Sequence, residues 1–378
     1  MIALPVYHPD TPDHLLLQPG FKLNGATIER MKQLGIDQLW IKYPALEQIE
    51  RRVNPAVIRA RAELAGQIRQ AFDSIQNQCL AHLDYNAYTQ TISKLIEQLL
   101  THPASVICLG SMFAQGRSLM NHCLRVTYIS VLMGAKLDAY LIRERPRLLP
   151  RRAKEIHSLG LGAMLHDVGL LLLPAEMRDV VPYSLVNADP AWRAHVEPNN
   201  QTLLTSLPAT VRAVVAQHHQ HFDGSGFPRI PNSAGQLTGM SGHDIHIFAR
   251  IVTVANAFDR LQASLREKPL PSVVVLNAML SERYRSWFDP TVLGALLAIM
   301  PAYSPGAMVT LNNGRKAVVV AHHDADPCRP TIQWHKPTAA DGDERSIDLR
   351  EHDDLHITHI GDQNVESFNF KAAELQLA

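Results

Sequence analysis

Histidine is the residue type in this sequence that could carry most of its chemistry. The chain of 378 residues contains 19 histidines. A lone histidine is more often a surface or core residue than a metal ligand, so its sequence context has to decide. Eight fall between residues 157 and 246: His157, His166, His195, His218, His219, His221, His243 and His246. This gathering predicts one histidine-rich site.

Four His-Asp dipeptides occur, so the dipeptide alone has no diagnostic value. They are His166-Asp167, His243-Asp244, His323-Asp324 and His352-Asp353. Only the first follows an apolar helical run, over residues 159–165, and precedes Val168-Gly169. Its two side chains would lie in a helical core, where unpaired charge is costly. A metal ion would satisfy both.

The pair His218-His219 closes another helical run, over residues 211–216. Neighbouring helical residues point about 100° apart, so both side chains reach one site only when the helix end lies against it. The loop 223–228 follows, and its Gly224 and Gly226 allow the backbone to approach a ligand closely. Imidazole and carboxylate ligands favour a divalent transition metal such as iron, manganese, zinc or nickel over calcium.

Composition excludes several classes of protein. Lys plus Arg and Asp plus Glu are equal at 36 each, which argues against binding to nucleic acid or a membrane surface through bulk charge. The four cysteines are far apart and form no CxxC pair, so we expect neither a zinc ribbon nor a disulfide framework, but a reduced, cytoplasmic protein. The N-terminus lacks the pattern of a signal peptide, and no apolar run approaches the roughly 18 residues of a membrane span.

The positioning elements are mainly helical. Residues 26–34 fit a helix and 39–43 a strand, which together predict a small α+β unit. Helical periodicity then dominates residues 56–83 and 88–300. From residue 305 the pattern becomes β-rich, with a hairpin of strands 308–311 and 317–321 around Asn312-Asn313-Gly314, and further strands at 331–334 and 355–360. The fold class is therefore mainly α, with a small β-rich C-terminal module.

A heptad-like apolar seam marks residues 56–83. Six of eight positions in two seven-residue series are apolar: Ile58, Ala65, Phe72, Cys79, Ile68 and Ile75. One interpretation is a helix packed on its own chain, and the other is a homodimer through this helix.

Five segments together resemble the HD-GYP family, which hydrolyses the bacterial second messenger cyclic di-GMP. They are Asn121-His122-Cys123-Leu124-Arg125-Val126, Leu165-His166-Asp167-Val168-Gly169, Arg193-Ala194-His195, the run from His218 to Pro228, and the run from Ala249 to Asp259. The resemblance covers about residues 115–300. It implies an HD-domain helical bundle at 111–300, preceded by an α+β domain at 1–50 and a helical linker at 51–110, and followed by the β-rich module at 301–378.

The resemblance also implies a binuclear metal centre, of iron or manganese. His122, His166 and Asp167 would bind one metal with Asn256, and Asp167, His195, His218 and His219 a second. His166 and Asp167 would be the catalytic residues. Arg266 and Lys268 lie where the family places phosphate-binding cations, and Gly224 and Gly226 would lie near the substrate.

Departures from the family pattern affect this centre. Asn256 stands where the family usually has a metal-binding Asp, and a neutral amide is the poorer ligand. Leu170 replaces a Lys thought to contact phosphate. Ser118 falls near the position of a Glu that adds a third metal in some members. Gln220 and Phe227 replace the Glu after the paired histidines and the Tyr of GYP.

Three functions follow. The first is a metal-dependent phosphodiesterase that converts cyclic di-GMP to pGpG or GMP. The second is a degenerate, non-catalytic HD-GYP protein that binds cyclic di-GMP or a signalling partner protein and relays a signal; Asn256 and Leu170 favour it. The third is a general nucleotide phosphohydrolase, against which the loop 223–228 argues.

Overall fold

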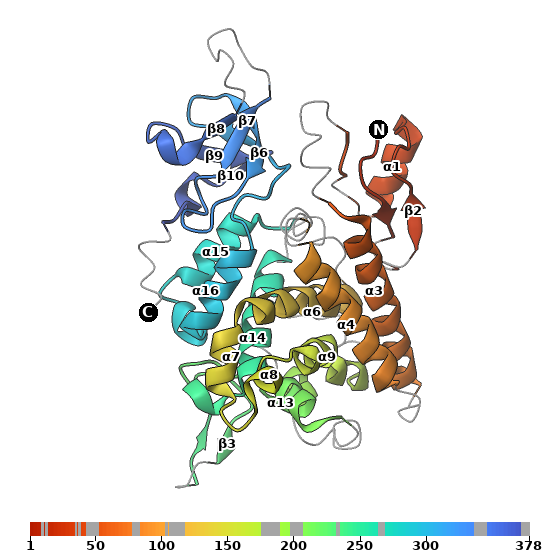
Figure 1. Ribbon diagram of the computed structural model, residues 1–378, viewed down its shortest axis with the longest axis vertical. Helices are drawn as coiled ribbons and strands as arrows, with labels where there is room; N and C mark the ends of the chain where they lie inside the picture. Colours follow the sequence, from red (N-terminus) through yellow and green to blue (C-terminus); the bar gives the residue numbers. More distant parts are fainter. Residues whose placement is uncertain are drawn as a thin grey trace.

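The computed structural model describes most of the chain. The described residues are 1–8, 11, 14–34, 36, 39–42, 53–77, 84–102, 105, 118–174, 190–196, 207–231, 235–263, 269–335 and 346–371. They form a helical bundle, a small N-terminal unit beside it and a C-terminal sheet (Figure 1). The predicted fold class is confirmed.

The elements follow in chain order. The α-helices are α1 (Gly25–Gln33), α3 (Pro55–Gln76), α4 (Tyr85–Thr101), α6 (Leu119–Lys136), α7 (Asp138–Glu144), α8 (Pro150–Ala153), α9 (His157–Leu165), α11 (Pro190–Arg193), α13 (Ala209–Gln217), α14 (Ile247–Gln262), α15 (Ser272–Leu280) and α16 (Pro290–Ile299). The short 3-10 helices are η3 (Val168–Leu172), η4 (Ala194–Val196), η5 (Gly242–Asp244), η6 (Arg285–Trp287), η8 (Leu349–Glu351) and η9 (Glu366–Phe368). The strands are β1 (Val6–Tyr7), β2 (Leu15–Leu17), β3 (Ile230–Pro231), β4 (Leu237–Thr238), β5 (Met308–Leu311), β6 (Lys316–Ala321), β7 (Thr331–Trp334), β8 (Ser346–Asp348), β9 (Ile357–Ile360) and β10 (Gln363–Asn364).

Helix α6 is the centre of the bundle. Every residue from 120 to 134 is buried. The helix begins at Ser118, whose hydroxyl accepts a hydrogen bond from the Asn121 N–H and so satisfies one of the open donors of the first turn. Helices α3, α9, α14 and α16 pack around α6. Polar side chains on a helix buried on all sides need partners, and His122 and Arg125 of α6 find them on α14.

The C-terminal sheet is antiparallel with strand order β10-β9-β5-β6-β7-β8. The predicted hairpin is confirmed, because β5 pairs with β6 across a turn in which Gly314 has a φ of +77°. The strand predicted at 355–360 is shorter, and β9 covers Ile357–Ile360. One hydrophobic core runs from the helices into this sheet. The division of the chain into domains at 50, 110 and 300 stays a prediction.

The N-terminal unit has a small core of its own, formed by Ile2, Val6, Leu17, Met31 and Ile36. The predicted helix is present as α1. The strand predicted at 39–43 is wrong within the described residues: Ile41 forms a single bridge with Ile2, and Tyr43 lies outside them. Among the described residues, this bridge does not extend into a longer strand pair. The paired strands of the N-terminal unit are β1 and β2.

The apolar seam of α3 faces the protein's own core. Ile58, Ala65, Ile68, Phe72 and Ile75 are all buried against the rest of the chain, with α4 and α6 as neighbours. The structure therefore favours packing on the same chain over the dimer predicted through residues 56–83; Cys79 lies outside the described residues. Among the described helices, none has the length and hydropathy needed to cross a membrane.

Candidate metal centre

The buried helix α6, the ends of α9 and α13 and the short helix η4 bring the predicted ligands together. His122 lies on α6, and His166 caps the C-terminus of α9 with Asp167 next to it. His195 lies in η4, and His218 with His219 follows the end of α13. All six side chains are buried. The arrangement needs a glycine after Asp167, because a Cβ on Gly169 would lie 2.1 Å from the His195 carbonyl oxygen.

In four of the histidines, Nδ1 makes a hydrogen bond and the other ring nitrogen, Nε2, faces Asp167. The Nδ1 atoms of His166, His195 and His218 lie 2.7, 2.7 and 2.9 Å from the carbonyl oxygen three residues earlier. A carbonyl only accepts, so each Nδ1–H donates and each Nε2 keeps its lone pair. His122 Nδ1 likewise donates to Asp259 Oδ2, 2.6 Å away. Such second partners fix the ring of a metal-binding histidine.

Asp167 divides the centre in two. Its Oδ1 lies 3.2 Å from His195 Nε2 and 3.2 Å from His218 Nε2. Its Oδ2 lies 3.3 Å from His122 Nε2 and 3.4 Å from His166 Nε2. We call His122, His166 and Asp167 the first group, and Asp167, His195, His218 and His219 the second group. In each group the candidate ligand atoms lie within 4.8 Å of one another.

The second group fits a transition metal. Within the described part of the chain, the buried Nε2 atoms of His195 and His219 have no hydrogen-bond partner. Leaving two ring nitrogens without a partner in a core is costly, and a cation would satisfy both. Imidazole nitrogens with one carboxylate oxygen are ligands that iron, manganese, zinc and nickel accept. The role of these residues as ligands stays a proposal.

The first group already contains an organic cation. Arg260 Nη2 donates to Asp167 Oδ2 at 3.0 Å, on the oxygen that faces His122 and His166. Arg260 Nε donates to Asn256 Oδ1 at 2.6 Å. The amide that would replace a carboxylate ligand is therefore directed at a guanidinium. The Asp259 carboxylate accepts hydrogen bonds from both His122 Nδ1 and Arg125, and so fixes the His122 ring from the side away from Asp167.

The ionisation of the centre follows from burial and from these partners. Burial lowers the pKa of His218 to about 3 and holds that of His219 well below its usual value, so both imidazoles are neutral bases near pH 7. Burial opposes the charge of His122 too, but its contacts with Asp167 and Asp259 outweigh burial and raise its pKa. Burial would raise the pKa of Asp167, whereas His166 and Arg260 hold it well below the usual range. Asp167 is thus an anion.

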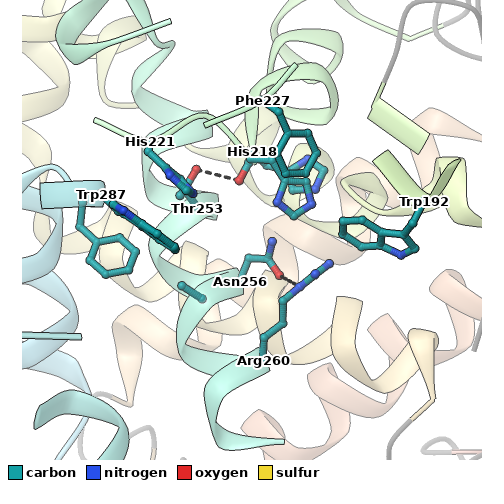
Figure 2. Close-up of a pocket in the computed structure, with 11 residues that line it drawn as sticks. Trp192, His218, His221, Phe227, Thr253, Asn256, Arg260 and Trp287 are labelled. Atoms are coloured by element: carbon teal, nitrogen blue, oxygen red, sulfur yellow. Dashed lines mark hydrogen bonds between the residues drawn. The ribbon is translucent and has the colours of Figure 1, made fainter. Parts of the chain in front are cut away.

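A pocket with aromatic walls opens onto the second group. Figure 2 shows Trp287 and His221 on one side and Trp192 and Phe227 on the other, with Asn256 and Arg260 between them. The rings of His221 and Trp287 stack at 4.0 Å, and Phe227 stacks on His219 at 4.6 Å. Trp192, Trp287 and Arg260 were not among the predicted site residues. Arg260 is one turn after Asn256, and that spacing on a helix was the available signal.

The remaining predicted residues have other placements. Arg266 and Lys268 lie outside the described residues. Neither Gly224 nor Gly226 lines the pocket; a Cβ on Gly226 would lie 2.4 Å from the His219 carbonyl oxygen, so this glycine lets the loop pack on the histidine pair. Their part in substrate binding stays a prediction. Arg250, in the Ala249–Asp259 segment, pairs with the carboxylates of Glu144 and Asp289.

Two departures from the family pattern acquire structural roles. Leu170 is buried against Trp192, so an apolar contact stands where a phosphate-binding lysine was expected. Gln220 holds the loop 223–228 in place, because its Nε2 donates to the Pro228 carbonyl at 2.6 Å and its Oε1 accepts from the Met240 N–H at 2.9 Å. An amide can make both bonds, and an ionised Glu could make only the second.

The helical bundle was compared with known protein families. Residues 135–292 match the family model described as HD domain. These residues are similar to an HD domain. The family resemblance seen in the sequence is thereby confirmed. The matched residues run from the end of α6 to the start of α16 and include Asp167.

Curated relatives of this protein carry related names. A cyclic di-GMP phosphodiesterase from Pseudomonas aeruginosa is 24% identical over 298 residues, which are 77% of this chain and 64% of the relative. A 3′3′-cGAMP-specific phosphodiesterase from Vibrio cholerae is 30% identical over 46% of this chain and 34% of the relative. The chain thus spans less than two thirds of these relatives. A solved structure, an HDG"Y"P protein from Bdellovibrio bacteriovorus, is 16% identical, with a TM-score of 0.47 over 75% of this chain and 89% of its own.

Proposed function

We propose that this HD protein is a metal-dependent phosphodiesterase that hydrolyses cyclic di-GMP to pGpG or GMP. The observation that carries the proposal is the convergence of four imidazole Nε2 atoms on the two oxygens of Asp167. The names of the relatives support the class of reaction. Both cyclic di-GMP and 3′3′-cGAMP are cyclic dinucleotides with phosphodiester bonds, so they share the scissile group.

Each part of the site has a task in this reaction. The His218 and His219 imidazoles and the ionised Asp167 would hold a divalent metal at the second group. A divalent metal supplies Lewis acidity toward a phosphate oxygen and toward water. The carbonyl groups of residues 163, 192 and 215 keep three of the rings in the orientation that ligation needs.

The aromatic pocket walls would orient the substrate. A purine base can stack on an indole face, and each such contact is worth about 1–3 kcal/mol. Trp287 is partly exposed, and His221 stacks on one face of its indole ring. This contact fixes the orientation of the ring before a substrate binds. Arg260 lines the same pocket and would offer a positive charge to a phosphate of the substrate.

The test is hydrolysis by the purified protein. The full chain is loaded with manganese or iron and incubated with each cyclic dinucleotide, and products are separated by chromatography. We expect linear pGpG or GMP from cyclic di-GMP, with the Asp167→Asn variant inactive. Trp287→Ala should raise KM about 10-fold with little change in metal content. An intact substrate after incubation with metal-bound protein would rule out the catalytic proposal.

A second candidate function is a non-catalytic receptor for cyclic di-GMP or for a partner protein. The ion pair of Arg260 with Asp167 favours it, since that guanidinium meets the carboxylate oxygen that the first metal would need. Binding of cyclic di-GMP by calorimetry, without any product, would support the receptor over the enzyme.

A further inference from the structure

Arg260 is held on three sides inside the centre. Its Nε binds Asn256 Oδ1 at 2.6 Å, its Nη2 binds Asp167 Oδ2 at 3.0 Å, and its Cζ lies 4.9 Å from the ring centre of Trp192. The side chain is 2% exposed. A guanidinium stays charged at any pH at which proteins fold, so this is a permanent buried cation with a dedicated set of partners.

The position of this cation is specific to one half of the centre. Asp167 Oδ2 faces His122 at 3.3 Å and His166 at 3.4 Å, and the guanidinium shares that oxygen. Asp167 Oδ1, on the other side, meets only imidazoles among the contacts made by described residues, those of His195 and His218. The two oxygens of one carboxylate therefore differ in what neutralises them.

Charge balance makes a guanidinium and a metal ion competitors at the first group. Like charges a few ångströms apart in a core repel strongly, and a neutral Asn256 adds no anion to offset a second cation. The nearby carboxylate of Asp259 is already paired with Arg125 and His122. On α14, Asn256 thus provides a neutral amide where a metal would need an anionic ligand, and Arg260, four residues later, provides a cation in the place of the metal.

We infer that Arg260 takes the place of the first metal, so that the chain binds a single divalent metal at the second group. This inference rests on the proposed metal-dependent function. Two of the five N–H groups of the guanidinium are used in the bonds to Asn256 and Asp167. The others can donate to an anion in the pocket that Arg260 lines, so the residue supplies charge to a phosphate as the absent metal would.

The test is the number of metals bound per chain. Wild-type protein and three variants are loaded with Mn(II), freed of excess ion and measured by elemental analysis. Arg260→Met combined with Asn256→Asp removes the guanidinium charge and restores a carboxylate, and Arg260→Lys retains the charge. Arg250→Met is the matched control, because Arg250 is a second buried arginine of α14 whose partners, Glu144 and Asp289, lie outside the centre. We expect one metal in wild type, Arg260→Lys and Arg250→Met, and two in Arg260→Met combined with Asn256→Asp.

The outcomes separate this inference from the proposed function. Two metals in the wild-type chain would overturn the role of Arg260 and leave the metal-dependent function supported. No metal in the wild-type chain would overturn both. Should the arginine variants fail to fold, the electron paramagnetic resonance spectrum of the wild type decides: an isolated Mn(II) pattern agrees with the inference, and a coupled two-ion pattern contradicts it.

Discussion

The first and second groups share Asp167 and the same ring chemistry, yet their surroundings differ. In the first group the pKa of His122 is raised by two carboxylates, and a guanidinium binds Asp167 Oδ2. In the second group the pKa of His218 is lowered to about 3, and two buried Nε2 atoms lack a partner within the described residues. In the first group the charge of Asp167 is neutralised by Arg260. In the second group two ring nitrogens remain that could bind a cation. A list of histidines alone would have treated both halves alike.

The largest expected effect comes from the residue that both groups share. Asp167→Asn removes the central anion and leaves the buried Arg260 without its carboxylate, which costs roughly 3–5 kcal/mol of folding free energy. We expect metal to be lost and hydrolysis of cyclic di-GMP to fall at least about 100-fold. Metal content, thermal unfolding and turnover measure this. The exposed Asp244→Asn is the control, and an Asp167→Asn protein that retains metal and turnover would refute the shared role.

A paired substitution tests the difference between the groups directly. His195→Ala removes a ligand of the second group, so we expect metal affinity to fall on the order of 100-fold. His122→Ala removes a member of the first group, and metal affinity should stay within about 3-fold of wild type because Arg260 already occupies that side. Titration with Mn(II) followed by calorimetry gives both constants. Equal losses in the two variants would show that the groups do not differ as described.

Glycine substitutions probe the second group without touching a ligand. The Cβ of Gly169→Ala would collide with the His195 carbonyl, so η3 and η4 must separate and metal affinity should fall about 10-fold. In the control Gly160→Ala, the Cβ meets the side chains of Ile92 and Val131 instead. That variant should lose roughly 1–3 kcal/mol of stability without a change in metal affinity. If both variants bind metal equally, the contact between η3 and η4 does not position His195.

The smallest effect concerns a histidine outside both groups. The His246 Nδ1 accepts from the Phe248 N–H at the start of α14, and burial together with Arg145 and Arg250 lowers its pKa to about 4. The unfolded chain binds a proton near pH 6.5 and the folded chain does not until about pH 4, so stability falls as pH falls through this window. The shift from 6.5 to about 4 corresponds to roughly 3 kcal/mol, and partial solvent exposure of the ring reduces the His246 share to about 1–2 kcal/mol.

Chemical unfolding in a chelator, at pH 7 and pH 4.5, isolates this share. His246→Asn keeps a capping acceptor and no longer titrates, so its stability should fall less than that of the wild type. His356→Asn, which removes one member of an exposed pair with Glu366, should behave as the wild type does. The same acid loss in His246→Asn and wild type would assign the pH dependence to other groups.

Local patterns in the sequence account for most of the fold. The helical pattern of residues 26–34 predicted α1, and the Asn312-Asn313-Gly314 turn predicted the β5–β6 hairpin, because turn chemistry acts over a few residues. The strand at 39–43 was wrong because strand formation needs a partner of matching length, which the sequence does not display. The seam of α3 was ambiguous for a similar reason, since an apolar face does not reveal which chain covers it.

The residues of the centre were predictable from the sequence, and its electrostatics were not. The family motifs brought together His122, His166, Asp167, His195, His218 and His219, and the structure places them side by side. The role of Arg260 depends on how α14 is rotated about its axis and on the contact with Trp192 of α11. Both depend on tertiary packing between segments far apart in the sequence. The spacing of Arg260 one turn after Asn256 indicated that it lies near the centre, but it did not indicate that the guanidinium would bind Asp167.

The most direct test of the account is a crystal structure of the manganese-loaded protein, measured at a wavelength where manganese scatters anomalously. The account predicts one anomalous peak per chain, bounded by Asp167 Oδ1 and the Nε2 atoms of His195, His218 and His219, with Arg260 still bound to Asp167 Oδ2. A peak between His122 and His166, or the absence of any peak at Asp167, would contradict it.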